Sequence, residues 1–285
     1  MKPRLHRRDW PFYAALGVLA AAYALLVAAM VAATTGYVLQ PAAAESPAAA
    51  WGAAHPTWAR IVPPALGAAL ADADIQSAVR LTLVASTLAT ILALWVGVPT
   101  GYLLARTRFR GRMLLDALAD VPLVLPPMVV GVSLLLLFRF LPRSWGDAVI
   151  YERPAIVLAQ FVVAASLVAR TMKATFAHVS PRAEQVALTL GCTPRQAFGR
   201  VALPEARRGL LAAATLAWAR SLGEFGPVLV FAGAVRGKTE VLATSVFLEL
   251  SVGNLVGAAA VSLVMIAAAA IVLAITRIWG GDAAT

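Results

Sequence analysis

The sequence predicts an all-α membrane protein whose chain crosses the bilayer six times. Apolar residues make up 61% of the 285 positions, charged residues make up 13%, and the mean hydropathy is +0.81. A soluble domain is about half apolar and about a quarter charged, so this chain cannot cover itself with polar groups in water. Its apolar stretches are near twenty residues long, which suits membrane-crossing helices better than the strands of a barrel, each about ten residues.

Six stretches are long and apolar enough to cross about 30 Å of hydrocarbon. We place them at 12–38, 78–105, 114–140, 154–172, 207–235 and 255–277. The chain is therefore expected to comprise an N-terminal helix with an external Ala/Pro-rich loop (1–77), a five-helix core (78–277) and a short tail (278–285).

The first span follows a basic segment and resembles a signal peptide in that respect. Three alanines at 42–44 could serve as a cleavage site. The apolar core of a signal peptide is only about 7–15 residues, however, and this span is much longer. We expect an uncleaved membrane helix.

Two later spans contain residues that are unusual in a bilayer. Pro126 and Pro127 interrupt the third span and remove backbone donors, which is tolerated only beside protein or a water-filled cavity. They mark either a simple kink or the lining of a substrate pathway. Arg220 and Glu224 lie four residues apart in the fifth span and share one helix face. Because charges at this depth are costly unless paired or hydrated, they form either a structural ion pair or a site where Arg220 attracts an anion.

The basic residues predict the orientation of the chain. More than twice as many of the 24 Lys and Arg residues fall in segments on the side of the N-terminus as on the other side. Because cytoplasmic loops carry this excess, both termini are expected in the cytoplasm. The longest inside loop is then 173–206.

This inside loop is expected to form two short amphipathic helices. Ser180 precedes a proline and can cap the first helix, which Gly191 ends as a C′ glycine. Thr193 also precedes a proline and can cap the second helix, which Pro204 stops. Apolar residues recur at helical spacing in both segments, so each helix has one face that can be buried.

The spacing of residues in this loop is distinctive. Gly191 is followed by nine residues and then by Val201-Ala202-Leu203-Pro204. Upstream stands the triplet Gln185-Val186-Ala187, preceded by Glu184. The arrangement resembles the permeases of ABC importers, whose signature is E-A-A, three residues, G, nine residues, a hydrophobic residue, any residue and L-P. This chain departs from the family in the triplet, where the acid stands one place earlier.

The resemblance implies that the loop docks on a soluble ATPase. The second helix is expected to present Phe198 as an exposed apolar knob, flanked by Arg195 and Arg200, that sits in a groove of the ATPase. The alternative is an amphipathic helix that binds only lipid. Lipid binding would require neither Gly191 nor the fixed spacing that follows it.

Further motifs occur along the rest of the chain. They are Leu81-Thr82-Leu83, Gly97-Val98-Pro99, Leu104-Ala105-Arg106, Phe109-Arg110-Gly111-Arg112, Pro122-Leu123-Val124-Leu125-Pro126-Pro127 and Ala219-Arg220-Ser221-Leu222-Gly223-Glu224-Phe225-Gly226. Their order and spacing over 78–277 are similar to those of the molybdate, tungstate and sulfate permeases.

This second resemblance implies the partners and the substrate. It implies a pathway between two permease copies, two ATPase subunits docked at 182–204 and an external protein that delivers the substrate. Molybdate or tungstate is the preferred substrate, and the close alternative is a sulfate or thiosulfate permease. The sulfate relatives usually pair two different permeases, whereas the molybdate and tungstate relatives pair two copies of one, so a homodimer is expected.

Several other functions are disfavoured by the sequence. The net charge of +10 is concentrated at the ends of spans, which indicates topology rather than binding to nucleic acid. Neither a metal site nor a catalytic constellation is visible, so we expect no cofactor and no enzymatic activity. The segment 232–239 nearly spells a phosphate-binding loop but follows a membrane span rather than a buried strand. A secondary carrier is also disfavoured because the halves show no repeat and the spans hold one buried acid.

Overall fold

The computed structural model describes residues 10–39, 47–55 and 62–281, and this part of the chain is helical without strands. The first half contains α1 (Trp10–Val38), α2 (Pro47–Ala54), α3 (Pro64–Ala71), α4 (Ala73–Arg106), α5 (Arg112–Val124), α6 (Pro127–Phe140) and α7 (Arg143–Val149). The second half contains α8 (Arg153–His178), α9 (Pro181–Thr189), α10 (Pro194–Ala197), the π-helical segment Phe198–Ala202, α11 (Leu203–Glu205), α12 (Arg207–Leu222), α13 (Gly226–Phe231), α14 (Leu242–Ser251) and α15 (Leu255–Gly281). The basic residues of the first eight positions, Arg60 and the last four residues of the tail lie outside the described ranges.

Four of the six predicted spans are confirmed as long apolar helices. Among the described residues, α1, α4, α8 and α15 are long and apolar enough to cross a membrane. The third predicted span is a bent pair, because α5 and α6 meet at 115° where Pro126 and Pro127 interrupt the backbone hydrogen bonds. Counting this pair as one span gives five crossings, so the predicted number of six is not confirmed.

The fifth predicted span, 207–235, is wrong as a single helix. Helix α12 ends at Leu222, and the chain resumes a helix only at Gly226. Pro227 has no N–H to continue the helix, and its ring would clash with the carbonyl group four residues earlier, at Gly223. The span is therefore broken in its second half, next to Glu224.

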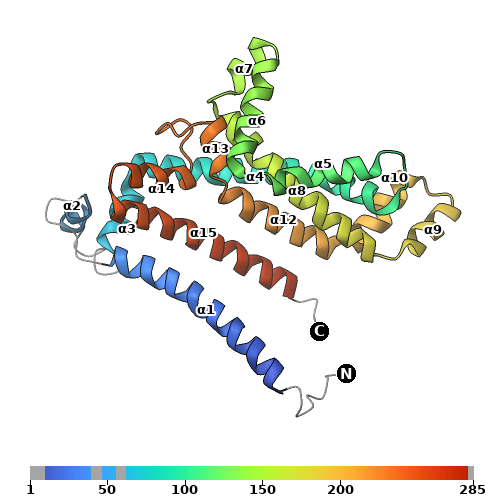
Figure 1. Cartoon of the computed structure of the whole chain (residues 1–285), viewed down its shortest axis with the longest axis horizontal. Helices are drawn as coiled ribbons and strands as arrows, with labels where there is room; N and C mark the ends of the chain where they lie inside the picture. Colours follow the sequence, from blue (N-terminus) through green and yellow to red (C-terminus); the bar gives the residue numbers. More distant parts are fainter. Residues whose placement is uncertain (1–9, 40–46, 56–61, 282–285) are drawn as a thin grey trace.

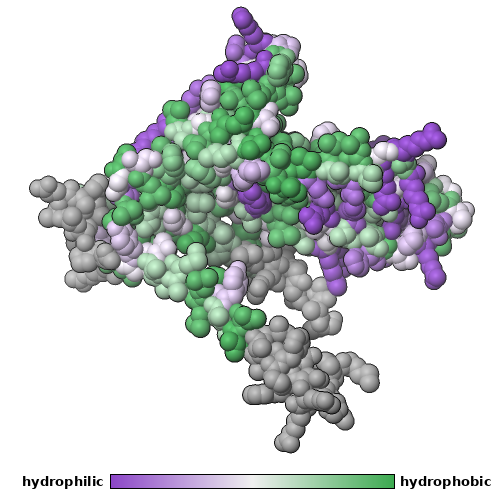
Figure 2. Space-filling model, in the orientation of Figure 1, coloured by the Kyte–Doolittle hydropathy of each residue, from purple (hydrophilic) through white to green (hydrophobic). Residues whose placement is uncertain are grey.

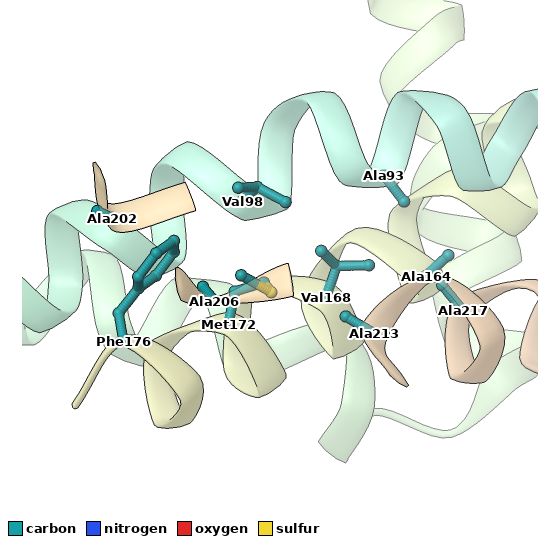
Figure 3. Packing of buried hydrophobic residues seen from close by; sticks show 10 residues of the cluster. All are labelled: Ala93, Val98, Ala164, Val168, Met172, Phe176, Ala202, Ala206, Ala213 and Ala217. Atoms are coloured by element: carbon teal, nitrogen blue, oxygen red, sulfur yellow. The ribbon is translucent and has the colours of Figure 1, made fainter. Parts of the chain in front are cut away.

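The centre of the body is the contact between α4 and α8, which run in the same direction (Figure 1). A Cβ atom on Gly97 would lie 2.7 Å from Val168 Cγ1, and one on Gly101 would lie 2.8 Å from the backbone nitrogen of Lys173. Glycine is thus required at both positions for the helices to approach this closely. Figure 3 shows the adjoining cluster, in which alanines from α4, α8 and α12 surround Val168 and Met172.

More than half of the buried apolar side chains that the structure describes are alanines. Small residues let helix backbones come close together, and in lipid this packing replaces the hydrophobic driving force that acts in water. The body is therefore held together by close contact between helices rather than by large interdigitating side chains.

Helix α1 lies apart from the rest of the body (Figure 1). Its side chains from 18 to 33 are all exposed, and the helix packs mainly against α15. The exposed surface is apolar, so in a bilayer it contacts lipid or another protein.

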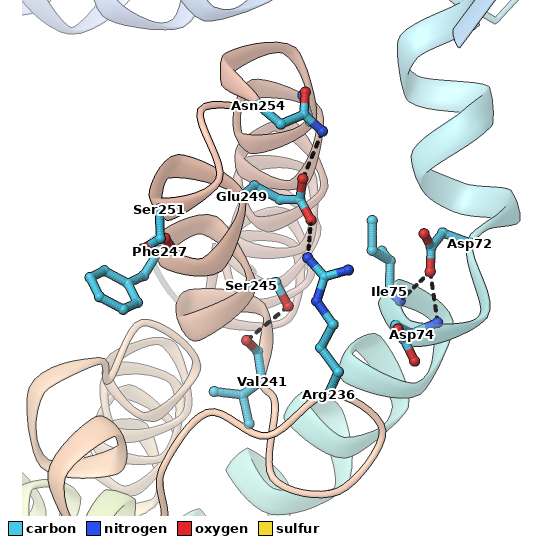
Figure 4. A network of polar contacts seen from close by, with 11 residues as sticks. Asp72, Asp74, Ile75, Arg236, Val241, Ser245, Phe247, Glu249, Ser251 and Asn254 are labelled. Carbon is cyan, nitrogen blue, oxygen red and sulfur yellow. Dashed lines mark hydrogen bonds and ion pairs between the residues drawn. The ribbon is translucent and has the colours of Figure 1, made fainter. Parts of the chain in front are cut away.

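Polar residues gather toward the ends of the body. Figure 2 shows hydrophobic residues over the middle, and hydrophilic residues along the arm formed by α6 and α7 and at the end that carries α9 and α10. At the opposite end a polar network fixes the loop between α13 and α14 (Figure 4): Arg236 donates to Glu249 at 2.9 Å, and Asn254 donates to the same carboxylate at 2.7 Å. Burial raises the pKa of the neighbouring Glu240 carboxyl above its ordinary value.

Candidate functional site

The loop between α8 and α12 begins with the first helix that the sequence predicts. Ser180 caps α9 by accepting a hydrogen bond from the Arg182 N–H at 3.4 Å. Gly191 has a left-handed φ of 89°, which favours glycine. Its N–H donates to Leu188 O at 3.1 Å, and the N–H of Cys192 donates to Ala187 O at 3.0 Å. These two bonds form a Schellman motif, so the predicted C′ glycine is confirmed.

The second helix also starts where predicted but does not stop where predicted. Thr193 and Gln196 form a capping box, with hydrogen bonds of 3.3 and 2.9 Å. The helical path then widens into the π-helical segment and continues through α11. Pro204 lies in the first turn of α11, where its missing N–H is tolerated, so it does not end the helix as expected.

Glu184 has a role that the sequence analysis did not predict. Its carboxylate accepts hydrogen bonds from Tyr102 Oη at 2.8 Å and from Arg106 Nε and Nη2 at 3.0 and 2.8 Å. Arg106 also donates to Val179 O at 2.9 Å. The Glu184 and Arg106 side chains are only 8% and 13% exposed. This buried clamp attaches the start of the loop to the end of α4.

Phe198 is not the exposed knob that the sequence analysis expected. Its ring lies 4.6 Å from the ring of Tyr102 and 6.2 Å from that of Phe176, as measured between centroids. Phe198 therefore points into the body and ties the second helix to α4 and α8. The inward direction lets the Phe198 ring contact two other aromatic rings, those of Tyr102 and Phe176, instead of water.

The exposed apolar side chains of the loop are on α9 instead. Val186 is 57% exposed and Leu190 is 80% exposed. Gln185 and Arg195 are also exposed, whereas Ala187 is buried and Leu203 is half-buried against the central cluster. An exposed leucine beside charged residues is a surface suited to a protein partner.

Arg220 and Glu224 form an ion pair at the end of α12, as their spacing predicts. Glu224 is buried, whereas the Arg220 side chain is 38% exposed. The carboxylate is thus enclosed by the body, whereas the Arg220 side chain is only partly covered.

The two interrupted helices pack against each other. A Cβ atom on Gly226 would lie 2.8 Å from Pro127 Cβ and 3.2 Å from Met128 N. A Cβ on Gly131 would likewise lie 2.9 Å from Pro227 Cα. The bend between α5 and α6 therefore adjoins the break that contains Glu224, and the structure brings the predicted prolines and the predicted ion pair into one region. The loop lies at the other end of α12.

Within the described ranges, no group of three or more His, Cys, Asp or Glu residues has an arrangement that could hold a metal ion. The features that the structure assembles are thus a clamped loop at one end and a buried ion pair beside two helix breaks.

Comparison with known proteins agrees with this arrangement. Residues 97–280 match the family model for the inner-membrane component of binding-protein-dependent transport systems. The sulfate transport system permease protein CysT of Salmonella typhimurium is 36% identical over 207 residues, which cover 70% of this chain and 74% of CysT. The molybdenum transport system permease protein ModB of Mycobacterium tuberculosis is 35% identical over 217 residues, covering 74% and 81%. The molybdate/tungstate permease protein WtpB of Pyrococcus furiosus is 34% identical over 168 residues, covering 59% and 65%.

Solved structures show the same fold at low sequence identity. A chain of a bacterial ABC transporter that imports alginate has a TM-score of 0.71 at 16% identity, covering 98% of both chains. A chain of the MetNI methionine ABC transporter in an inward-facing conformation has a TM-score of 0.62 at 20% identity, covering 73% of this chain and 95% of that one.

Proposed function

The chain belongs to the family of inner-membrane components of binding-protein-dependent transport systems, and from this we propose that it is the permease subunit of an ATP-driven oxyanion importer. It forms the membrane passage, with 78–277 as the transport core, and does not hydrolyse ATP itself. A separate ATPase subunit, present in two copies, supplies the energy, and an external binding protein delivers the substrate. Both termini face the cytoplasm, which the distribution of basic residues supports.

The observation that carries this proposal is the clamped loop. A loop that transmits movement must be fixed to the body at one side and exposed to its partner at the other. Glu184 and Phe198 provide the fixed side through α4 and α8. Val186 and Leu190 provide an exposed apolar side, with Arg195 nearby. We propose that the ATPase binds this exposed side of α9, rather than Phe198.

Molybdate or tungstate is the substrate that we propose first. The relatives ModB and WtpB are named for these metals, and both ions are tetrahedral and doubly charged. Sulfate or thiosulfate is the second candidate, because CysT is equally similar. We further propose that two copies of the chain form the passage.

The buried ion pair fits a passage for anions. The Arg220 side chain is partly exposed, while Glu224 holds it in place through the ion pair. A cation restrained in this way lowers the cost of moving a dianion through a region of low dielectric without binding it so tightly that release is slow. Pro126 and Pro127 adjoin this region and are proposed to let the passage open and close.

The function is tested by transport in reconstituted vesicles. The chain is combined with the ATPase and binding protein encoded beside it, and uptake of labelled molybdate, tungstate and sulfate is measured with and without ATP. ATP-dependent uptake of at least one oxyanion is expected. No uptake of any of the three, from vesicles in which the complex is assembled, would reject the oxyanion proposal.

The docking surface is tested separately by co-purification. Leu190→Asp places a charge on the exposed apolar side of α9 and should abolish co-purification of the ATPase. Phe109→Asp, on the exposed loop before α5, is the matched control and should leave it intact. Normal recovery of the ATPase with Leu190→Asp would show that the ATPase does not bind the exposed side of α9.

A further inference from the structure

A second basic region lies at the loop end of the body, apart from the ion pair of α12. It is a cleft of about 970 Å³ between α5, α8 and the start of α12. Three basic side chains line it: Arg170 and His178 from α8, and Arg208 from the first turn of α12. Glu205 is the acidic residue in the lining. We refer to this region as the basic cleft.

The arginines of the basic cleft have no anionic partner within the described ranges. The ion pairs found there join other residues, and neither Arg170 nor Arg208 takes part in one. His178 Nδ1–H donates to Ala174 O of its own helix at 2.7 Å, so Nε2 of the neutral ring is an acceptor and offers no hydrogen to an anion. Two guanidinium groups that lack an ion-pair partner among the described residues therefore line one cleft, together with the carboxylate of Glu205.

The arginines of the cleft suit a tetrahedral anion, and the cleft is far larger than one such ion. Arginine presents parallel N–H donors that match two oxygens of such an ion. Thr171 and Thr175 donate their hydroxyl hydrogens to Leu167 O and Thr171 O, so these two hydroxyl groups offer no donor to the anion. Leu123 and Leu167 supply the apolar part of the wall. The site is open rather than closed, so it would hold an anion weakly.

The position of the cleft relates anion binding there to transport. Arg208 and Arg220 stand twelve positions apart on α12, which corresponds to roughly 18 Å along the helix axis and about 120° around it, so the two side chains lie at different levels and on different faces. An anion that passes the level of Arg220 toward the loop end would next reach the level of Arg208, a second positively charged site, before it enters water. A weak site there lowers the barrier to leaving the membrane and still permits release.

We propose that the basic cleft binds the transported tetrahedral oxyanion on its way out of the passage. This inference rests on the proposed function and names the residues of the exit site: Arg170 and Arg208. The phosphate of an anionic lipid has similar chemistry, and the experiment must separate the two sources.

The test is equilibrium binding to the full chain with its ATPase in nanodiscs. The nanodiscs contain only phosphatidylcholine, so no anionic lipid is present, and labelled molybdate or sulfate is the probe. Wild type should bind the ion weakly. Arg170→Gln and Arg208→Gln should each weaken binding about tenfold, because each removes charge-assisted hydrogen bonds. Arg170→Lys should retain part of the binding. Arg108→Gln, an exposed arginine outside the cleft, is the control and should bind like wild type.

A second arm replaces phosphatidylcholine with phosphatidylglycerol, and bound lipid is counted by native mass spectrometry. The proposal is supported when the oxyanion binds in both lipids and the two glutamine variants lose it. It is overturned when no oxyanion binds, when the variants bind like the control, or when phosphatidylglycerol binds to the cleft and the oxyanion does not. Uptake by wild type in vesicles separates this outcome from failure of the proposed function: uptake without binding rejects the cleft alone, and absence of uptake rejects the function.

Discussion

The clamp between Glu184 and α4 predicts a large effect of a single truncation. Glu184→Ala removes the carboxylate and leaves the Arg106 guanidinium group buried without its partner. It also removes the acceptor of the Tyr102 hydroxyl. The start of the loop is then held to α4 mainly by the bond from Arg106 to Val179 O. We expect α9 and α10 to detach transiently from the body.

The size of the effect follows from burial. Removing one partner of a buried ion pair costs roughly 3–5 kcal/mol, and the residual exposure of these side chains places the cost near the lower value. About 3 kcal/mol corresponds to a change of roughly 100-fold in the local opening equilibrium, since about 1.4 kcal/mol is tenfold. Asp116→Ala provides the matched control, because Asp116 pairs with Lys173 at 2.5 Å but both side chains are about one third exposed. An exposed pair contributes at most about 1 kcal/mol.

The assay is hydrogen exchange of the amides in 181–205, followed by mass spectrometry, for the chain in nanodiscs. Exchange that is limited by local opening should become roughly 100-fold faster in Glu184→Ala and change less than about fivefold in Asp116→Ala. In the assembled transporter, ATP hydrolysis should persist in Glu184→Ala while uptake falls, because the loop no longer moves the body. Equal exchange in Glu184→Ala and wild type would refute the clamp, and equal acceleration in both variants would show that burial does not set the effect.

Three further predictions follow from other parts of the structure. Gly101→Val places a side chain against Met172 and the backbone of α8, which should destabilise the fold by about 2 kcal/mol or more. A thermal shift assay should show the corresponding drop in melting temperature. An unchanged melting temperature would contradict the close approach of α4 and α8. Arg220→Ala leaves the buried Glu224 without its ion-pair partner and should abolish uptake in vesicles. The double variant Arg220→Leu with Glu224→Leu should assemble normally but transport slowly. Wild-type uptake by the double variant would show that the pair is purely structural. Cys192 is partly exposed, and an impermeant thiol reagent should label it only after the membrane is permeabilised, so that labelling of intact cells would reverse the orientation.

The sequence predicted well whatever depends on neighbouring positions along the chain. The Schellman motif at Gly191 and the capping box of Thr193 use atoms within six residues of each other, so their signals are complete in a short segment. The ion pair of Arg220 and Glu224 belongs to the same class, because the two residues are only four positions apart, and it forms although Glu224 lies just beyond the end of α12. The long apolar helices were also predicted, since their length reflects the thickness of a bilayer.

The directions of two loop side chains could not be predicted in this way. Glu184 binds Arg106, which is 78 positions earlier, and Phe198 packs against Tyr102 and Phe176. An amphipathic pattern shows which face of a helix is apolar but does not identify the surface that covers it. The sequence analysis noted both partners separately: Arg106 as part of a motif and Glu184 as the acid one place before the triplet. Only the folded structure shows that these two residues form an ion pair.

The break of the fifth predicted span was missed for a different reason. Mean hydropathy over 207–235 is insensitive to the direction of the backbone, so a helix that ends at Leu222 and resumes at Gly226 looks continuous. Pro227 was the available signal, because proline cannot continue a helix but is tolerated in the first turn of a new one.

The alanine-rich interior has a consequence for how this chain tolerates change. In a core built from large side chains, truncation is the damaging event, because it leaves a cavity. Here more than half of the buried apolar side chains in the described part of the chain are alanines, which have little to remove, and at Gly97 and Gly101 the helices leave no room for a Cβ atom. The harmful direction is therefore enlargement: even one added methyl group at Gly97 or Gly101 must push α4 and α8 apart. Natural variation should accordingly leave these two glycines unchanged and keep the other interior positions small, while the lipid-facing surface varies among the larger apolar residues.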